Sequence, residues 1–113
     1  MTKNNVATAE AYYTAFGKKS IAEMEQYLHP DVHFVGPFAQ LSGKKAVIEA
    51  AKTFAKMFNT LTIRVKFGSD DQAMIVYDFD WLDLGKTFSA AVLMTFHDGL
   101  IAKVELFYDS RPF

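Results

Sequence analysis

The C-terminal half of the sequence alternates between extended apolar runs and turn residues, and this pattern constrains the fold more than any other feature. Turns at Gly68, Gly85 and Asp98-Gly99 separate the runs, and an Asp-Gly pair between apolar segments is a strong hairpin signal. Strands joined by such short turns form an antiparallel meander. The four predicted strands are Leu61–Phe67, Gln72–Leu84, Lys86–His97 and Leu100–Tyr108.

The N-terminal half predicts helices that cover the apolar face of this sheet. An apolar stripe at helical spacing, made of Val6, Ala9, Tyr13 and Phe16, predicts the first helix over residues 5–17. Ser20 and Glu23 have the spacing of a capping box, which begins a second helix. His29-Pro30 ends that helix, because the residue before a proline avoids the helical region.

A short strand, Asp31–Gly36, and a third helix between Gly43 and Asn59 complete this half. The third helix has the clearest amphipathic pattern in the chain. Its predicted buried face is Val47, Ala50, Ala51, Phe54, Ala55 and Phe58. Helices followed by a meander predict an α+β fold, in which a curved sheet wraps around three helices as a cone with an open end. Such an open end is a natural place for a ligand cavity.

The bulk composition excludes several classes of function. A chain of 113 residues predicts one domain, residues 1–113, and its 12 basic and 13 acidic residues are interspersed. Neither a nucleic acid nor an anionic membrane is therefore expected as a partner. The absence of cysteine excludes disulfides, cysteine-based zinc sites and thiolate catalysis, and we expect no metal or cofactor. We see no leader-like segment and no run of ~20 apolar residues, so a cytoplasmic location is expected.

The predicted strand Gln72–Leu84 has two chemically different faces. Side chains alternate along a strand, so the aromatic residues Tyr77, Phe79 and Trp81 share one face with Ile75. Asp78 and Asp80 share the other face with Met74, Val76 and Leu82. If the aromatic face is internal, it forms the wall of a core or pocket. If the acidic face is internal, the two carboxylates become candidates for catalysis or metal binding.

The order of the elements and several motifs resemble the SnoaL-like members of the nuclear transport factor two-like superfamily, relatives of ketosteroid isomerase and polyketide cyclases. The resemblance covers essentially the whole chain and implies a single SnoaL-like domain. It further implies a cystatin-like α+β barrel with a curved, mixed-edge sheet, a hydrophobic pocket and a homodimer formed through the convex sheet face. The motifs are Ala11–Phe16, Pro30–Phe38, Gly43–Ile48, Asp98–Ile101 and Glu105–Asp109.

Ketosteroid isomerase chemistry is only partly supported by the residues at the matching positions. That chemistry uses an aspartate as base, with a tyrosine and a protonated aspartate as donors to the oxyanion. Tyr12 matches the oxyanion tyrosine, but Gly36 stands at the position of the base and Val92 at that of the second acid. An epoxide hydrolase is disfavoured in the same way, because Leu106 stands where the last strand would need a carboxylate.

The same matching directs the aromatic face of Gln72–Leu84 toward the cavity. Asp78 and Asp80 then face outward, where they would be solvated or paired with a lysine or arginine across the sheet, such as Lys66 or Lys103. The predicted ligand-binding residues are Tyr12, Phe34, Phe54, Phe58, Tyr77, Phe79, Trp81, Phe88, Val92, Met94, Leu106 and Tyr108.

Tyr12, His33 and Asp109 are the candidate catalytic residues. Tyr12 would polarise an oxygen of the substrate, and His33 or Asp109 would move a proton. Each has a simpler interpretation: Tyr12 as a packed helix residue, His33 as an exposed edge residue, and Asp109 as an anchor for the tail through Arg111.

Three functional hypotheses follow from these residues. The first is a protein that binds a small hydrophobic molecule, with isomerase or cyclase activity on an apolar carbonyl compound. The second is a non-catalytic carrier that uses the aromatic cavity only to sequester its ligand. The third is a dimeric accessory module whose interior is filled.

Overall fold

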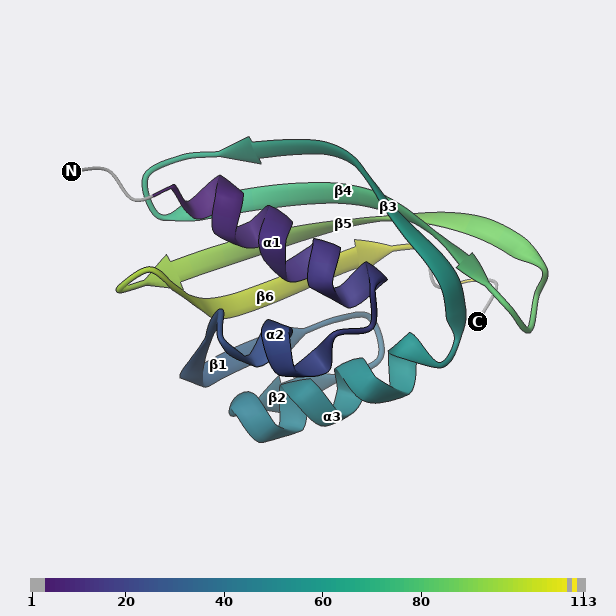
Figure 1. The fold of residues 1–113 in the computed structure, drawn as a ribbon, viewed down its shortest axis with the longest axis horizontal. Coiled ribbons are helices and arrows are strands. Elements are labelled where there is room, and N and C mark those ends of the chain that lie inside the picture. Colours follow the sequence, from purple (N-terminus) through teal and green to yellow (C-terminus); the bar gives the residue numbers. More distant parts are fainter. Residues whose placement is uncertain (1–3, 110, 112–113) are drawn as a thin grey trace.

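The computed structural model describes residues 4–109 and 111, which form three helices and six strands (Figure 1). The elements run α1 (Asn5–Gly17), α2 (Ile21–Glu25), β1 (Leu28–Val35), β2 (Gln40–Ser42), α3 (Lys44–Ala55), β3 (Phe58–Gly68), β4 (Gln72–Trp81), β5 (Lys86–His97) and β6 (Leu100–Tyr108). Of the helices in the described part of the chain, none is long and apolar enough to cross a membrane.

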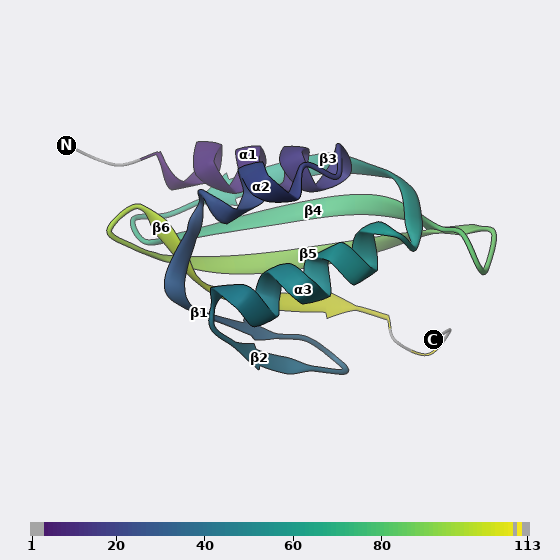
Figure 2. The same cartoon turned by 60° about the horizontal axis from the view of Figure 1, so that its bottom comes forward.

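The six strands form one curved sheet in the order β2-β1-β6-β5-β4-β3. All neighbours are antiparallel except β1 and β6, which are parallel. The helices lie on one face, with α1 along β3 and β4 and α3 along the β1 end (Figures 1 and 2). The predicted α+β fold with its mixed-edge sheet is confirmed. The sheet is open, with β2 and β3 as its edges, and does not close into a barrel.

The strands of the C-terminal meander match the sequence pattern closely. The bounds of β5 and β6 are those predicted, and Asp98 adopts a left-handed conformation (φ 54°) in the turn between them. The strand predicted to reach Leu84 ends at Trp81 instead. The amides of Leu84 and Gly85 both donate to the Trp81 carbonyl, and this turn ends the strand before Leu84.

Two helices are shorter than predicted, because apolar spacing alone does not mark where they end. The second helix stops at Glu25, so Leu28 opens β1 and Pro30 lies within a strand. Ser20 stands at its N-cap without the predicted side-chain hydrogen bond. The third helix stops at Ala55, and Phe58, one helical turn after Phe54, opens β3. The short strand β2 was not predicted.

The hydrophobic core fills the space between the helices and the inner face of the sheet. Residues from nearly every element are fully excluded from solvent there. The largest of them are Met24, Leu28, Val32, Phe58, Ile75, Tyr77, Val92, Met94, Ile101 and Val104. Alternation along β4 and β5 places every second side chain in this layer, which fixes the register of the sheet against the helices.

Candidate functional site

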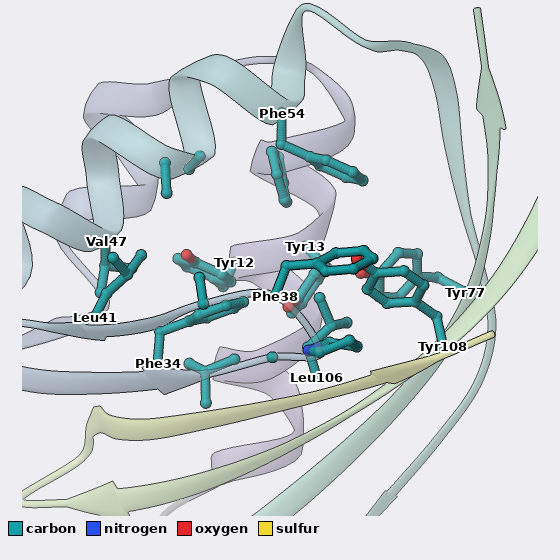
Figure 3. A pocket seen from close by; sticks show the side chains of 17 residues that line it. Tyr12, Tyr13, Phe34, Phe38, Leu41, Val47, Phe54, Tyr77, Leu106 and Tyr108 are labelled. Carbon is teal, nitrogen blue, oxygen red and sulfur yellow. The ribbon is translucent and has the colours of Figure 1, made fainter. Parts of the chain in front are cut away.

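A pocket of about 210 Å³ opens at the end of the core where α1, α3 and the β1–β2 hairpin meet the end of β6 (Figure 3). Its lining is Tyr12, Tyr13, Phe16, Phe34, Gly36, Pro37, Phe38, Ala39, Leu41, Val47, Ala50, Ala51, Phe54, Tyr77, Val104, Leu106 and Tyr108.

Small residues on two elements leave the space that forms this pocket. Ala50 and Ala51 face it from α3, and Gly36 faces it from the end of β1. A Cβ atom on Gly36 would stand only 3.0 Å and 3.3 Å from two ring carbons of Phe34. A larger residue at this position would therefore crowd the Phe34 ring, which lines the pocket.

The pocket is apolar and strongly aromatic. Eight of its 17 lining residues carry aromatic rings, and the remainder are aliphatic residues, glycine and proline. Among the described residues, no carboxylate, imidazole, ammonium or guanidinium group lines it. The side-chain polar groups that it does contain are tyrosine hydroxyls, from Tyr12, Tyr13, Tyr77 and Tyr108.

Two of these tyrosines are bonded to each other and join α1 to the sheet. The rings of Tyr13 and Tyr77 stack with centroids 5.0 Å apart, and the Tyr13 hydroxyl donates a hydrogen bond to the Tyr77 oxygen. Burial raises the pKa of both residues well above 10. Tyr77 and Tyr12 raise the pKa of Tyr13 further, whereas the hydrogen bond from Tyr13 lowers that of Tyr77 in part. Both hydroxyls therefore stay protonated at physiological pH.

Tyr12 presents a hydroxyl that no side chain of the described chain engages. The residue is 4% exposed, and none of the hydrogen bonds among the described residues involves its hydroxyl. No buried side-chain polar atom of the described chain lacks a partner, so this oxygen is not sealed from solvent. Burial raises its pKa well above 10, so the group remains a neutral donor. Figure 3 shows Tyr12 among the side chains that surround the pocket. A phenol in this position can donate to a neutral oxygen acceptor of a bound molecule.

Comparison with known proteins places this architecture in a family. The sequence model described as SnoaL-like domain matches residues 9–104. The chain belongs to the SnoaL-like domain family. No curated protein sequence matched this SnoaL-like domain significantly.

Solved structures of similar fold have diverse assignments. An NTF2-like protein of unknown function from Cytophaga hutchinsonii is 19% identical, with 99% of this chain and 96% of that chain covered and a TM-score of 0.84. A candidate ketosteroid isomerase from Kribbella flavida is 18% identical (94% and 78% covered, TM-score 0.81). A candidate polyketide cyclase from Sinorhizobium meliloti is 17% identical (89% and 94% covered, TM-score 0.81). At these identities the likeness shows a shared fold.

The predicted ligand-binding residues divide into two groups in this SnoaL-like domain. The first group lines the pocket and comprises Tyr12, Phe34, Phe54, Tyr77, Leu106 and Tyr108. The second group lies outside the pocket lining, within or against the filled core, and comprises Phe58, Phe79, Trp81, Phe88, Val92 and Met94. Side chains of both groups face the interior, so the alternation of side chains along a strand does not distinguish them. The two groups differ in which part of the interior they occupy.

Neither proposed proton carrier reaches the pocket. His33 is exposed on β1, where Nδ1 lies 3.1 Å from the Ser42 hydroxyl. Asp109 is exposed and accepts two hydrogen bonds from the Arg111 side chain and one from its amide. These bonds lower the pKa of Asp109 to about 2. Gly36 lines the pocket without a side chain, and Val92 is buried in the core.

The two aspartates of β4 lie on the outer face of the sheet, away from the helices. Asp78 accepts a 2.6 Å hydrogen bond from Ser89 and lies 3.6 Å from Arg64. Asp80 accepts hydrogen bonds from the amides of Asn59 and Thr60, at the place where the register of β3 shifts. The Thr60 amide is the main cause of its lowered pKa.

Asp78 lies beside an arginine across the sheet, Arg64, as the broader expectation held, but neither lysine suggested as a partner is one. Lys66 pairs with Glu10 at 2.8 Å, and Lys103 pairs with Glu105 at 3.5 Å. Both aspartates therefore contact residues of neighbouring strands on the outer surface of the sheet. The homodimer expected through this face stays a prediction.

Sequence reasoning missed part of the pocket lining. Tyr13 and Phe16 carried a signal, since both stood on the predicted apolar stripe of the first helix, and Val47, Ala50 and Ala51 stood on that of the third. Phe38 was overlooked because Gly36-Pro37 indicates only a loop, and a loop pattern does not show which way its side chains point.

Proposed function

We propose that this SnoaL-like domain binds a small, neutral, ring-containing molecule and donates a hydrogen bond from Tyr12 to an oxygen of that molecule. The observation that carries the proposal is the combination of an aromatic pocket and the unpaired hydroxyl of Tyr12 within it. Aromatic walls favour ring ligands through stacked and edge-on contacts. The hydroxyl gives such a ligand a fixed orientation.

The volume of the pocket limits the size of the ligand. A closed apolar cavity of ~150 Å³ is large enough to hold benzene. At about 210 Å³, this pocket suits one substituted ring or two fused rings, and its open side leaves room for a substituent that reaches solvent.

The electrostatics of the pocket favour a neutral ligand. An anion moved into it would lose its hydration without gaining a cationic partner from the described lining, and a cation would find no carboxylate there. The tyrosine hydroxyls stay protonated, because burial raises the pKa of Tyr12, Tyr13 and Tyr77. A ketone, an ester or a phenol fits these constraints.

A second candidate function is an isomerase or cyclase that acts on an apolar carbonyl compound. Its support is the fold shared with the candidate ketosteroid isomerase and polyketide cyclase, together with Tyr12 as a donor that could polarise a carbonyl. Such a reaction also needs a proton acceptor, and the described lining contains no carboxylate or imidazole. Binding without turnover is therefore the function that the geometry supports best.

Titration with 1-tetralone and with its hydrocarbon analogue tetralin tests the proposal by calorimetry. Tyr12→Phe should weaken binding of the ketone by about 3- to 10-fold, the value of one hydrogen bond, and leave tetralin binding unchanged. Equal affinities of both proteins for the ketone would instead favour a carrier that uses burial alone. No saturable binding of either compound to the unmodified protein would overturn the proposal.

The same ketone tests the second candidate. If the domain catalyses enolisation, the hydrogens next to the carbonyl of 1-tetralone exchange with D₂O faster than in buffer, which proton NMR detects. Tyr12→Phe should then abolish the acceleration. An exchange rate equal to that of buffer counts against an isomerase.

A further inference from the structure

Phe38 stands at the tip of the β1–β2 hairpin, beside the mouth of the pocket. Pro37 and Phe38 form a two-residue tip, which is closed by a 2.8 Å hydrogen bond from the Gly36 amide to the Ala39 carbonyl. The proline ring fixes its own φ angle, so the backbone has little freedom at this tip. The position of the Phe38 Cα atom is therefore set, and the side chain moves mainly by rotation about its own bonds.

The Phe38 side chain lines the pocket and is also widely exposed. Its exposed fraction is 66%, the largest among the exposed large apolar residues of the described chain. An aromatic ring left in water at the rim of an apolar cavity loses the contacts that a buried ring would make. A molecule in the pocket would supply a surface that this ring could cover.

Tyr108 lies next to Phe38 in the pocket lining. The ring centroids of Phe38 and Tyr108 lie 6.3 Å apart, with the ring planes inclined by 59° (Figure 3). A flat ring held between two others at van der Waals contact needs about 7 Å between the outer centroids, twice the ~3.5 Å carbon contact distance. To admit such a ring, Phe38 must turn until its plane is parallel to that of Tyr108 and move away by about 0.7 Å.

We propose that Phe38 covers the bound molecule and holds its ring against Tyr108, which makes the pocket selective for planar aromatic ligands over saturated ligands of the same size. This inference rests on the proposed function and adds the residue that determines its specificity. A puckered saturated ring is thicker than an aromatic ring and cannot stack, so it gains less from Phe38. Rotation of an exposed side chain takes picoseconds to nanoseconds, so capture does not slow entry.

Calorimetry with 1-tetralone and its fully saturated counterpart 1-decalone tests the inference. Phe38→Ala should weaken 1-tetralone binding by about tenfold and 1-decalone binding by less than about threefold. Phe38→Leu, which keeps an apolar side chain without the ring, should lose the preference for 1-tetralone while retaining part of the affinity. Stopped-flow measurements should place most of the change for Phe38→Ala in a faster dissociation rate.

Phe67→Ala is the matched control, because Phe67 is also exposed (60%) but lies on β3 and does not line the pocket. It should leave both affinities unchanged. If the unmodified protein binds 1-tetralone and Phe38→Ala binds it equally well, the role of Phe38 is overturned while the proposed function stands. If the unmodified protein binds neither ketone, both are overturned. Equal losses for the two ketones would show a general apolar contact and overturn the selectivity.

Discussion

The interior of this domain contains two aromatic regions of similar composition and opposite packing. One is the pocket. The other, the packed cluster, has centroid separations of 5.4–6.1 Å between neighbouring rings. The packed cluster consists of Phe16, Phe54, Phe58, Phe79, Trp81 and Phe88. Phe16 and Phe54 belong to both regions and mark the boundary between them.

The difference between the two regions arises from what faces the aromatic rings. In the packed cluster, Phe54 from α3 meets Phe79 and Trp81 from β4, so rings fill the space from both sides. In the pocket, α3 presents Ala50 and Ala51, which are too short to reach Leu106 on β6. Aromatic content therefore does not decide whether a cavity exists. The volume of the opposing side chains does.

Phe58→Ala should have the largest effect on stability, because Phe58 is fully buried in the packed cluster against Phe16 and Phe54. Removing the ring leaves a cavity lined by atoms that cannot close over it. We expect the free energy of unfolding to fall by about 3–5 kcal/mol, measured by urea denaturation.

Phe34→Ala provides the comparison within the pocket. Its ring is half-buried and already borders empty space, so its loss should cost less than that of Phe58. Equal losses for Phe34→Ala and Phe58→Ala would contradict the distinction between an open and a filled region.

A larger side chain should affect stability differently at two neighbouring turns of α3. Ala51 lines the pocket, whereas Ala55 is buried one turn later and does not. Ala55→Leu must displace packed atoms and should lower the free energy of unfolding by about 1–3 kcal/mol. Ala51→Leu extends into empty space, so its stability should change by less than about 1 kcal/mol while 1-tetralone binding is lost. Retained binding in Ala51→Leu would show that the ligand occupies another site.

How much of the fold could be predicted depended on whether a local signal marked the end of each element. The end of β5 at His97 and the start of β6 at Leu100 were correct because Asp98-Gly99 marks the hairpin turn between them. Phe58 was assigned to a helix because it lies four residues after Phe54, a spacing that continues the helical stripe. The amides of Lys56 and Met57 instead bond back to Thr53 and Phe54 and close the helix. No residue type in that stretch announces this turn.

The candidate site was predictable in kind and only partly in position. Parity along β4 correctly separated Tyr77 from Asp78, because alternation is a strict property of a strand. Parity cannot show how far along the sheet the core is filled. Val92 and Tyr108 both face inward on neighbouring strands, yet only Tyr108 borders the pocket. That outcome depends on side chains from α3 and the β1–β2 hairpin, which are distant in sequence.

Alkaline pH should lower the free energy of unfolding through the tyrosines that line the pocket. The packed cluster contains no tyrosine and therefore adds nothing to this pH dependence. An unfolded tyrosine loses its proton near pH 10, whereas burial raises the pKa of Tyr12 in the folded protein. Above pH 10 the unfolded state therefore binds fewer protons, and the free energy of unfolding falls as pH rises.

Each buried tyrosine that stays protonated contributes up to ~1.4 kcal/mol per pH unit to this decline. Below pH 10 both states are protonated, and Tyr12 has no effect on the pH dependence. Urea denaturation of Tyr12→Phe at pH 9, 10 and 11 should show a decline above pH 10 that is shallower than that of the unmodified protein by the share of one tyrosine. Identical slopes for the two proteins would mean that Tyr12 ionises as freely in the folded state as in water, and that its hydroxyl lies in solvent and not in an apolar pocket.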